Sequence, residues 1–228
     1  MIFRQLFDHE SSTYTYLVGD APSGEAILID PVLGQEEAYL QLLAQLGLTL
    51  KYAVDTHVHA DHVTALGKLR ERTGARTLMG KQSDVACASD WFGDGDVLAV
   101  GQLRIHTLFT PGHTDDSYCF YLPGQDMLFT GDTLLIRGTG RTDFQNGDAR
   151  AQYESLQRLL ALPGHTQVWP GHDYKGWTSS TLAEEQAHNP RLQVANSEAY
   201  AALMANLKLP NPKMMDVAVP ANKGCGMG

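Results

Sequence analysis

The stretch Thr56-His57-Val58-His59-Ala60-Asp61-His62 places three imidazoles and one carboxylate directly after the apolar run 50–54, which is typical of a buried strand. In an extended chain, residues two apart face the same way, so His57 and His59 are expected to point at one spot, with Asp61 and His62 on the turn into the next helix. Imidazole nitrogen and carboxylate oxygen suit zinc, iron, nickel or manganese better than calcium or magnesium. The stretch therefore predicts a transition-metal site in preference to a surface histidine cluster without function.

Three later strand ends deliver residues of the same kind. His113 follows the turn 110–112, Asp132 follows the strand expected at 127–130, and His172 and Asp173 follow the strand expected at 167–169. Core packing explains such recurrence poorly, because a buried aspartate or histidine without a partner is energetically costly. His113 alone would be taken for a hydrogen-bonded loop histidine. Together with the cluster, it is predicted to be a metal ligand.

The remaining sequence alternates strands with helices, and several strands form meanders. Strands are expected at 2–7, 13–18, 26–30, 50–54, 77–79, 97–100, 103–109, 118–122, 127–130 and 167–169. Helices are expected at 35–46, 60–73, 151–162, 181–188 and 197–207, a loop at 90–96, and an irregular tail from Pro210. Meanders and strand–helix–strand connections both fit an α/β fold in which two mixed sheets pack face to face with helices outside. The length favours one domain, 1–228.

Composition excludes several classes of partner. The chain carries 17 Lys plus Arg against 26 Asp plus Glu, a net charge of −9, without a basic run. Nucleic acid and anionic membranes are therefore not expected partners. No apolar run approaches the roughly 20 residues that a membrane helix needs.

The three cysteines Cys87, Cys119 and Cys225 are odd in number and scattered, which does not suggest a disulfide framework. They fit a reducing compartment, and the first residues lack signal- or transit-peptide character. We therefore expect a bacterial cytoplasmic protein, or one whose targeting segment has been removed. Cys225 is expected to be a disordered tail cysteine in preference to a reactive thiol.

Several segments together resemble the persulfide dioxygenases (sulfur dioxygenases) of the metallo-β-lactamase superfamily, nearly end to end. They are Thr56 to His62, Thr130-Gly131-Asp132, Leu134-Leu135-Ile136-Arg137-Gly138-Thr139-Gly140-Arg141-Thr142-Asp143-Phe144, Pro170-Gly171-His172-Asp173-Tyr174, Glu184-Glu185 and Asn189-Pro190-Arg191-Leu192. The run 134–144 is the specific one, since the histidine cluster alone indicates only the superfamily. The resemblance implies an αββα sandwich with the metal at the sheet edge.

The resemblance also implies the chemistry. One Fe(II) ion would be held by His57, His113 and Asp132, a 2-His-1-carboxylate set that leaves adjacent positions open. Glutathione persulfide would bind through its terminal sulfur beside O2. Both oxygen atoms would pass to that sulfur, and water would release sulfite and glutathione. A homodimer is plausible for this family.

Two alternatives remain open. In hydrolases of the superfamily, residues matching His59, Asp61, His62 and His172 complete a two-metal site, as in glyoxalase II, whereas here the resemblance implies that they orient the ligands. Against a thioester hydrolase, the run Val63-Thr64-Ala65 replaces a glycine pair, and the region after residue 189 is short. A non-catalytic binding module is disfavoured because every ligand is present.

For the organic part of the substrate, Arg141 is the first candidate, since a guanidinium binds a carboxylate in bidentate fashion. Tyr174 and Lys175 are weaker candidates. A structural ion-pair role is an alternative for Arg137 and is the expected role of Arg191. The chain departs from many relatives at Asp116-Ser117, where a Gly-Cys pair is common, and at Thr139, often cysteine. These departures leave the subgroup and the preferred persulfide open. No rhodanese domain fits within the chain.

Overall fold

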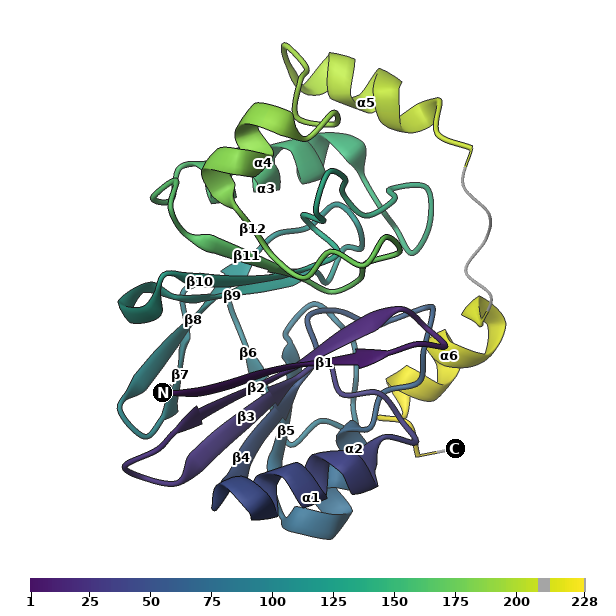
Figure 1. Ribbon diagram of the computed structural model, residues 1–228. Helices are drawn as coiled ribbons and strands as arrows, with labels where there is room; N and C mark the ends of the chain where they lie inside the picture. The colour runs from purple at the N-terminus through teal and green to yellow at the C-terminus, as the bar shows by residue number, and fades with distance from the viewer. Residues whose placement is uncertain (209–213, 228) are drawn as a thin grey trace. The chain divides into compact units, whose positions relative to one another are not determined.

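The computed structural model describes residues 1–208 and 214–227 (Figure 1). The chain divides into two compact units. Unit 1 comprises Met1–Phe92, Val97–Ile105 and Asn211–Gly228, and unit 2 comprises Gly93–Asp96 and His106–Pro210. The single domain expected for 1–228 stays a prediction.

Unit 1 is built on a mixed sheet with the strand order β1-β2-β3-β4-β5-β6. These strands are β1 (Ile2–Asp8), β2 (Thr13–Asp20), β3 (Glu25–Ile29), β4 (Thr49–Val54), β5 (Arg76–Gly80) and β6 (Asp90–Phe92). The first three form an antiparallel meander, and β3 to β6 pair in parallel. The meander and the parallel strands agree with the mixed sheet predicted from the sequence.

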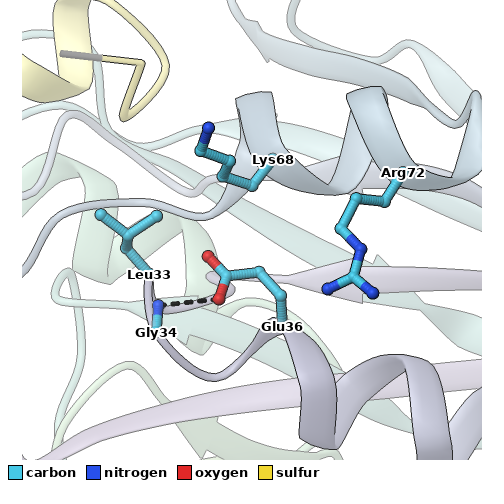
Figure 2. Close-up of a pocket in the computed structure, with 5 residues that line it drawn as sticks. All are labelled: Leu33, Gly34, Glu36, Lys68 and Arg72. Atoms are coloured by element: carbon cyan, nitrogen blue, oxygen red, sulfur yellow. Dashed lines mark hydrogen bonds between the residues drawn. The ribbon is translucent and has the colours of Figure 1, made fainter.

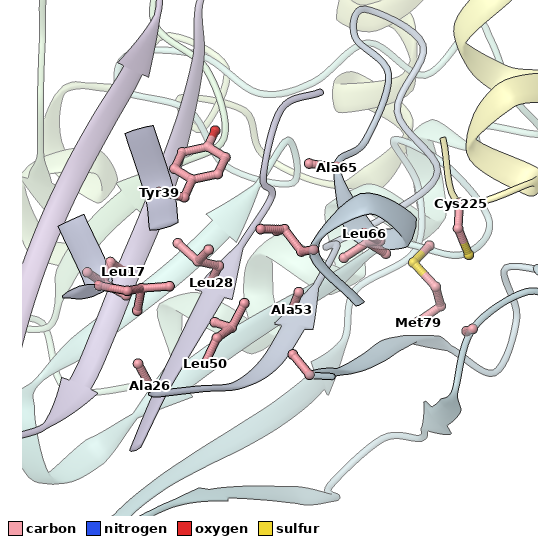
Figure 3. Close-up of a cluster of buried hydrophobic side chains, with 14 of the residues drawn as sticks. Leu17, Ala26, Leu28, Tyr39, Leu50, Ala53, Ala65, Leu66, Met79 and Cys225 are labelled. Carbon is pink, nitrogen blue, oxygen red and sulfur yellow. The ribbon is translucent and has the colours of Figure 1, made fainter. Parts of the chain in front are cut away.

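The helices of unit 1 that pack on this sheet are α1 (Glu36–Leu46) and α2 (Leu66–Thr73). Alternate residues of β2 and β3, such as Leu17 and Leu28, share one hydrophobic cluster with Leu43 of α1 and Leu69 of α2. Figure 3 shows Leu17, Leu28, Leu50 and Leu66 within this cluster. The period of two along the strands thus presents one apolar face to the helices.

The second sheet has the strand order β12-β11-β10-β9-β8-β7. Its strands are β7 (Val97–Val100), β8 (Leu103–Phe109), β9 (Tyr118–Leu122), β10 (Met127–Gly131), β11 (Gln167–Pro170) and β12 (Ser180–Thr181), with a 3-10 turn, η1 (Pro123–Gln125), between β9 and β10. In unit 2, α3 (Ala149–Leu160), α4 (Leu182–His188) and α5 (Ser197–Ala205) contribute to a core with β10 and β11. Because β10 and β11 are parallel, their carboxyl ends meet at one edge, where Asp132 and His172 follow.

Two predicted elements, the helix at 60–73 and the loop at 90–96, are wrong in part. The helix expected at 60–73 begins only at Leu66, because the main chain before it bonds elsewhere: Ala65 donates to Pro31 and Leu33 donates to Val63. The loop expected at 90–96 begins with β6, which pairs with β5 and buries Phe92. Both errors come from tertiary pairings that a local pattern does not contain.

The irregular tail expected from Pro210 is also wrong where the structure describes it, and residues 209–213 lie outside the described part. Residues Met215–Lys223 form α6, which contains Pro220. Cys225 is fully buried and forms a disulfide with Cys87. The prediction of a disordered tail cysteine is therefore wrong as well. A separation of 138 residues hides such a pair from sequence reasoning.

Among the residues that the structure describes, no helix has both the length and the apolar character needed to cross a bilayer.

Candidate metal centre

In unit 1, the histidine stretch lies on the loop 55–65 between β4 and α2. His57, His59 and His62 are all buried, with the ring centroids of His57 and His59 4.1 Å apart and those of His59 and His62 4.2 Å apart. The loop contains bends and is not the extended segment expected from the sequence, yet the rings still lie close together. Burial of three imidazoles demands polar partners.

Asp30, at the end of β3, is the residue that sequence reasoning missed. It adopts a left-handed backbone with φ 53° and accepts hydrogen bonds from the Thr56 amide (2.7 Å), the Thr56 hydroxyl (3.0 Å) and His59 Nε2 (3.2 Å). A signal was available, because an aspartate that ends a buried strand beside the parallel strand β4 reaches the same sheet edge. Asp30 therefore holds both the start of the loop and the His59 ring.

The Thr56 hydroxyl also fixes the tautomer of His57. That hydroxyl has one proton and gives it to Asp30, so towards His57 Nδ1, 3.0 Å away, it accepts. His57 Nδ1 then carries the ring proton, and Nε2 is the basic nitrogen. His57 thus presents Nε2 as a metal donor.

Three possible metal ligands in unit 1, His59, Asp61 and His62, have donor atoms within 4.8 Å of one another. His62 Nδ1 lies 3.0 Å from Asp61 Oδ2 and 3.2 Å from the hydroxyl of Thr13. Burial opposes protonation of His59, but the charges of Asp30, Asp61 and Asp55 outweigh it and raise the pKa of His59 to about 9. The group is chemically able either to ligate a cation or to form a hydrogen-bonded network beside one.

In unit 2, His113 follows a tight turn at Gly112. The backbone of Gly112 has φ 137°, and a Cβ there would stand 2.3 Å from the main chain of Gln152 on α3. The Asp148 amide at the start of α3 donates to the Gly112 carbonyl, 2.9 Å away. The helix therefore fixes the turn that carries His113.

The imidazole of His113 has a defined orientation. Its Nδ1 lies 2.7 Å from the carbonyl oxygen of Arg141, which can only accept, so Nδ1 carries the proton. Nε2, the basic nitrogen, lies 3.6 Å from Asp132 Oδ2. Two donors on one ion, each about 2.1 Å from it, lie at most about 4.2 Å apart. The pair therefore fits a shared metal ion.

The other oxygen of Asp132 is held by His172. His172 Nδ1 lies 2.6 Å from Asp132 Oδ1, and His172 is buried. Glycines make this close packing possible: a Cβ on Gly171 would stand 2.9 Å from Asp132 Oδ1, and one on Gly140 would stand 2.3 Å from the Asp132 carbonyl oxygen and 2.7 Å from His113 Nδ1. The arrangement directs Asp132 Oδ2, not Oδ1, towards His113.

The three residues predicted to bind substrate lie in unit 2. Arg141 donates from Nε and Nη2 to the carboxylate of Asp143, at 2.7 and 2.9 Å, and this ion pair lowers the pKa of Asp143. Tyr174 is 72% exposed and its ring stacks on that of His172, with centroids 6.2 Å apart. The ammonium of Lys175 lies over the Trp177 ring. Arg141 thus already binds one carboxylate, that of Asp143, in the bidentate geometry that a substrate carboxylate would need.

The loop 134–144 is fixed by the late residues of the chain. Arg137 pairs with Glu184 and Glu185 on α4, and Arg191 donates to the carbonyl of Thr139. Tyr200 on α5 bonds the Thr139 hydroxyl at 2.9 Å. Arg137 is therefore a structural ion-pair residue, whereas the described side-chain contacts of Arg191 are hydrogen bonds to Thr139 and not the ion pair expected for it.

A pocket in unit 1 is lined by Leu33, Gly34, Glu36, Lys68 and Arg72 (Figure 2). Its charges already have partners: Glu36 accepts from the Gly34 amide, Lys68 pairs with Glu71, and Arg72 pairs with Glu37. Such exposed pairs are ordinary surface chemistry. The pocket carries none of the predicted site residues.

Comparisons with known proteins agree with this chemistry. The model of the metallo-beta-lactamase superfamily matches residues 10–172. The mouse protein "Persulfide dioxygenase ETHE1, mitochondrial" is 47% identical over 229 residues, covering 100% of this chain and 89% of its own length. The human protein of the same name is 46% identical over 229 residues, with the same coverage.

The crystal structure of ETHE1 from Myxococcus xanthus is 56% identical in sequence. It superposes with a TM-score of 0.96 and covers 99% of this chain and 100% of that one. The predicted fold class, two mixed sheets flanked by helices in the metallo-β-lactamase fold, is confirmed by this likeness.

Proposed function

Because this chain belongs to the persulfide dioxygenases of the metallo-beta-lactamase superfamily, we propose that it oxidises glutathione persulfide with O2 and water to sulfite and glutathione, a reaction that removes sulfide-derived sulfur. The chain is an enzyme of the oxidoreductase class. The observation that carries the proposal is 47% identity to a persulfide dioxygenase over the whole chain, together with a donor set of the right chemistry.

For the cofactor, we propose one Fe(II) ion per chain, with His57, His113 and Asp132 as its ligands. Two neutral imidazoles and one carboxylate are the donor set typical of non-haem iron oxygenases. Support comes from each unit separately: His57 and His113 both present Nε2, and Asp132 Oδ2 lies 3.6 Å from His113 Nε2. When bound, the iron would supply the redox chemistry and the open positions for sulfur and O2.

The neighbouring residues prepare that site. Within unit 2, the carbonyl of Arg141 keeps the proton on His113 Nδ1, and His172 holds Asp132 Oδ1. With a single carboxylate among its ligands, a divalent ion would keep a net positive charge, which favours the binding of an anionic persulfide. We propose that His59, Asp61, His62 and His172 orient the ligands.

The glyoxalase II-type alternative, with two metals and thioester hydrolysis, has less support. The named relatives that match over the whole chain are persulfide dioxygenases. In unit 2, the 2.6 Å contact between His172 and Asp132 is a hydrogen bond, which fits an orienting role.

Substrate binding is proposed for Arg141, with Tyr174 and Lys175 beside it. Asp143 is 60% exposed and occupies the fork of Arg141, so its carboxylate would return to water when a glutathione carboxylate binds in that fork. A homodimer and a cytoplasmic location stay predictions, and the mammalian relatives are named as mitochondrial.

The test is oxygen uptake by anaerobically prepared, iron-loaded protein after addition of glutathione persulfide, with sulfite assayed in the same vessel. Matching uptake and sulfite would support the proposal. Glutathione alone and the zinc-loaded protein serve as controls and are expected to show neither. Absence of uptake in a sample verified to hold one iron, with hydrolysis of a glutathione thioester by the zinc form, would favour the alternative.

A further inference from the structure

The last described segment of unit 1, residues 214–227, bonds to the loop that carries the histidine stretch. In Figure 1 this segment is drawn in yellow and includes α6. Its side-chain hydrogen bonds to the loop come from Asn222, which is 2% exposed although it lies 160 residues after His62. Such burial of an amide requires partners for all its polar atoms.

Asn222 meets that requirement entirely with main-chain atoms of the histidine loop. Its Nδ2 donates to the carbonyl oxygens of His59 (2.9 Å) and His62 (2.8 Å). Its Oδ1 accepts from the amide of Thr64, 2.8 Å away. One side chain thus fixes three points of the loop on both sides of Asp61.

Independent contacts hold the segment against the first turn of α2 and against the loop. The Gly67 amide donates to the Cys225 carbonyl at 2.9 Å. A Cβ on Gly67 would stand 2.7 Å from that oxygen, and one on Gly226 would stand 2.0 Å from the Thr64 carbonyl oxygen. The close approach therefore needs both glycines, and the disulfide Cys87–Cys225 ties the segment to the connection between β5 and β6.

We propose that Asn222 is a positioning residue of the metal centre: it fixes the main chain at His59, His62 and Thr64, and the Cys87–Cys225 disulfide keeps it there. It touches neither substrate nor the reacting atoms. Its consequence for catalysis rests on the proposed function, but its effect on the loop and on metal affinity does not. Groups that orient metal ligands commonly change metal affinity about 10- to 100-fold.

The main experiment compares Asn222→Ala with wild type by hydrogen exchange of the metal-free protein and by metal titration. Amides of residues 59–65 are expected to exchange at least ten times faster in the variant, because three bonds to the loop are lost. Affinity for Co2+, measured against a competing chelator, is expected to fall about 10- to 100-fold. The visible spectrum of the cobalt protein is expected to change as well.

Two matched controls separate positioning from loss of stability. Leu43→Ala removes a buried side chain of α1 in the same unit, a side chain that makes none of the three hydrogen bonds to the loop, and is expected to lower the unfolding temperature without changing exchange at 59–65 or the cobalt spectrum. Asn206→Ala removes an exposed amide that bonds Ala202 and is expected to change nothing.

A conservative variant tests the donors alone. Asn222→Asp keeps an acceptor for the Thr64 amide but turns a carboxylate oxygen towards two carbonyl oxygens, so it is expected to reproduce the defect of Asn222→Ala. Wild-type exchange and cobalt affinity in Asn222→Ala, or the same changes in Leu43→Ala, would overturn the positioning role. Reduction of the disulfide is expected to speed exchange at 59–65 less than Asn222→Ala does, and unchanged exchange would remove the disulfide from the proposal.

The two proposals fail separately. If wild type consumes no oxygen with persulfide while Asn222→Ala loses cobalt affinity, the proposed function falls and the positioning role stands. If wild type is active and the variant keeps its affinity, spectrum and exchange rates, only the positioning role falls.

Discussion

At the scale of single residues, His113 owes its orientation to a main-chain atom, the carbonyl of Arg141. No side-chain substitution removes that partner directly, but neighbouring glycines control where it lies. Gly140 packs against both Asp132 and His113. Gly140 therefore shapes the part of the candidate metal centre in unit 2 although it has no functional group of its own.

Gly140→Ala is expected to lower metal affinity at least tenfold. Its Cβ would stand 2.3 Å from the Asp132 carbonyl oxygen and 2.7 Å from His113 Nδ1, so the loop must move. Gly138→Ala is a control on the same loop, because its Cβ would meet only Leu135, at 3.9 Å. Titration with Co2+ checks both, and a Gly140→Ala protein with wild-type affinity would contradict this account.

Asp132→Ala is expected to abolish iron binding and oxygen uptake together, since it removes a proposed ligand and the hydrogen-bond partner of His172. His62→Ala is expected to retain one iron. Iron content by elemental analysis distinguishes the two. Iron lost equally in both variants would favour a two-metal site.

Arg141→Ala is expected to raise KM for glutathione persulfide while the metal content stays unchanged, because alanine keeps the carbonyl that His113 needs. Loss of a paired carboxylate contact costs on the order of 2 kcal/mol, or about 30-fold in kcat/KM. Arg150→Ala, an exposed arginine near Glu198, is the control. Steady-state kinetics with an unchanged KM would remove Arg141 from the substrate site.

At the scale of elements, the N-terminus of α3 links helix stability to the His113 turn. Asp148 caps the helix by accepting from the amides of Arg150 (2.7 Å) and Ala151 (3.1 Å). Its own amide, which donates to Gly112, is independent of its side chain. The cap and the turn can therefore be separated by substitution.

Asp148→Ala is expected to lower the free energy of unfolding by about 0.5–2 kcal/mol, the usual cost of losing a cap. Metal affinity is expected to stay near wild type, because the Asp148 amide still donates to Gly112. Urea denaturation measures the free energy of unfolding, and cobalt titration measures the metal affinity. A large loss of affinity would show that the carboxylate itself supports the turn.

Local patterns predicted most strands and helices because an apolar run or a one-sided apolar period is contained in the segment itself. The sequence did not predict β6, α6 or the late start of α2, since pairing with β5 and bonding to the histidine loop are long-range. The same limit applies to the site. His57, His113 and Asp132 were chosen from motifs, whereas Asp30 and Asn222 act through contacts 26 or more residues away.

At the scale of the whole molecule, the disulfide closes a long stretch of chain, because its two cysteines have a sequence separation of 138. The sequence suggested a reducing compartment, so the pair shows that scattered, odd cysteines do not exclude a bridge. Chain entropy of the unfolded state gives such a long loop a stabilising effect of roughly 4–5 kcal/mol. The thiol of Cys119 is buried, takes no part in this disulfide and donates to the Thr130 carbonyl.

Reduction is therefore expected to lower the free energy of unfolding by a few kcal/mol, with about 5 kcal/mol as the value from the loop-entropy relation. Denaturant titration with and without dithiothreitol measures the effect. Cys225→Ser is expected to show the lower value in both conditions. Equal stability of oxidised and reduced wild type would contradict the expected contribution.

The contacts of Asn222 also impose an order on biosynthesis. The ribosome makes His62 160 residues before the amide that bonds its carbonyl. At about 5–20 residues per second, that interval lasts roughly 10–30 seconds. During it the nascent chain carries its imidazoles on a loop without this anchor, so selective uptake of the correct metal is expected to follow translation, not accompany it.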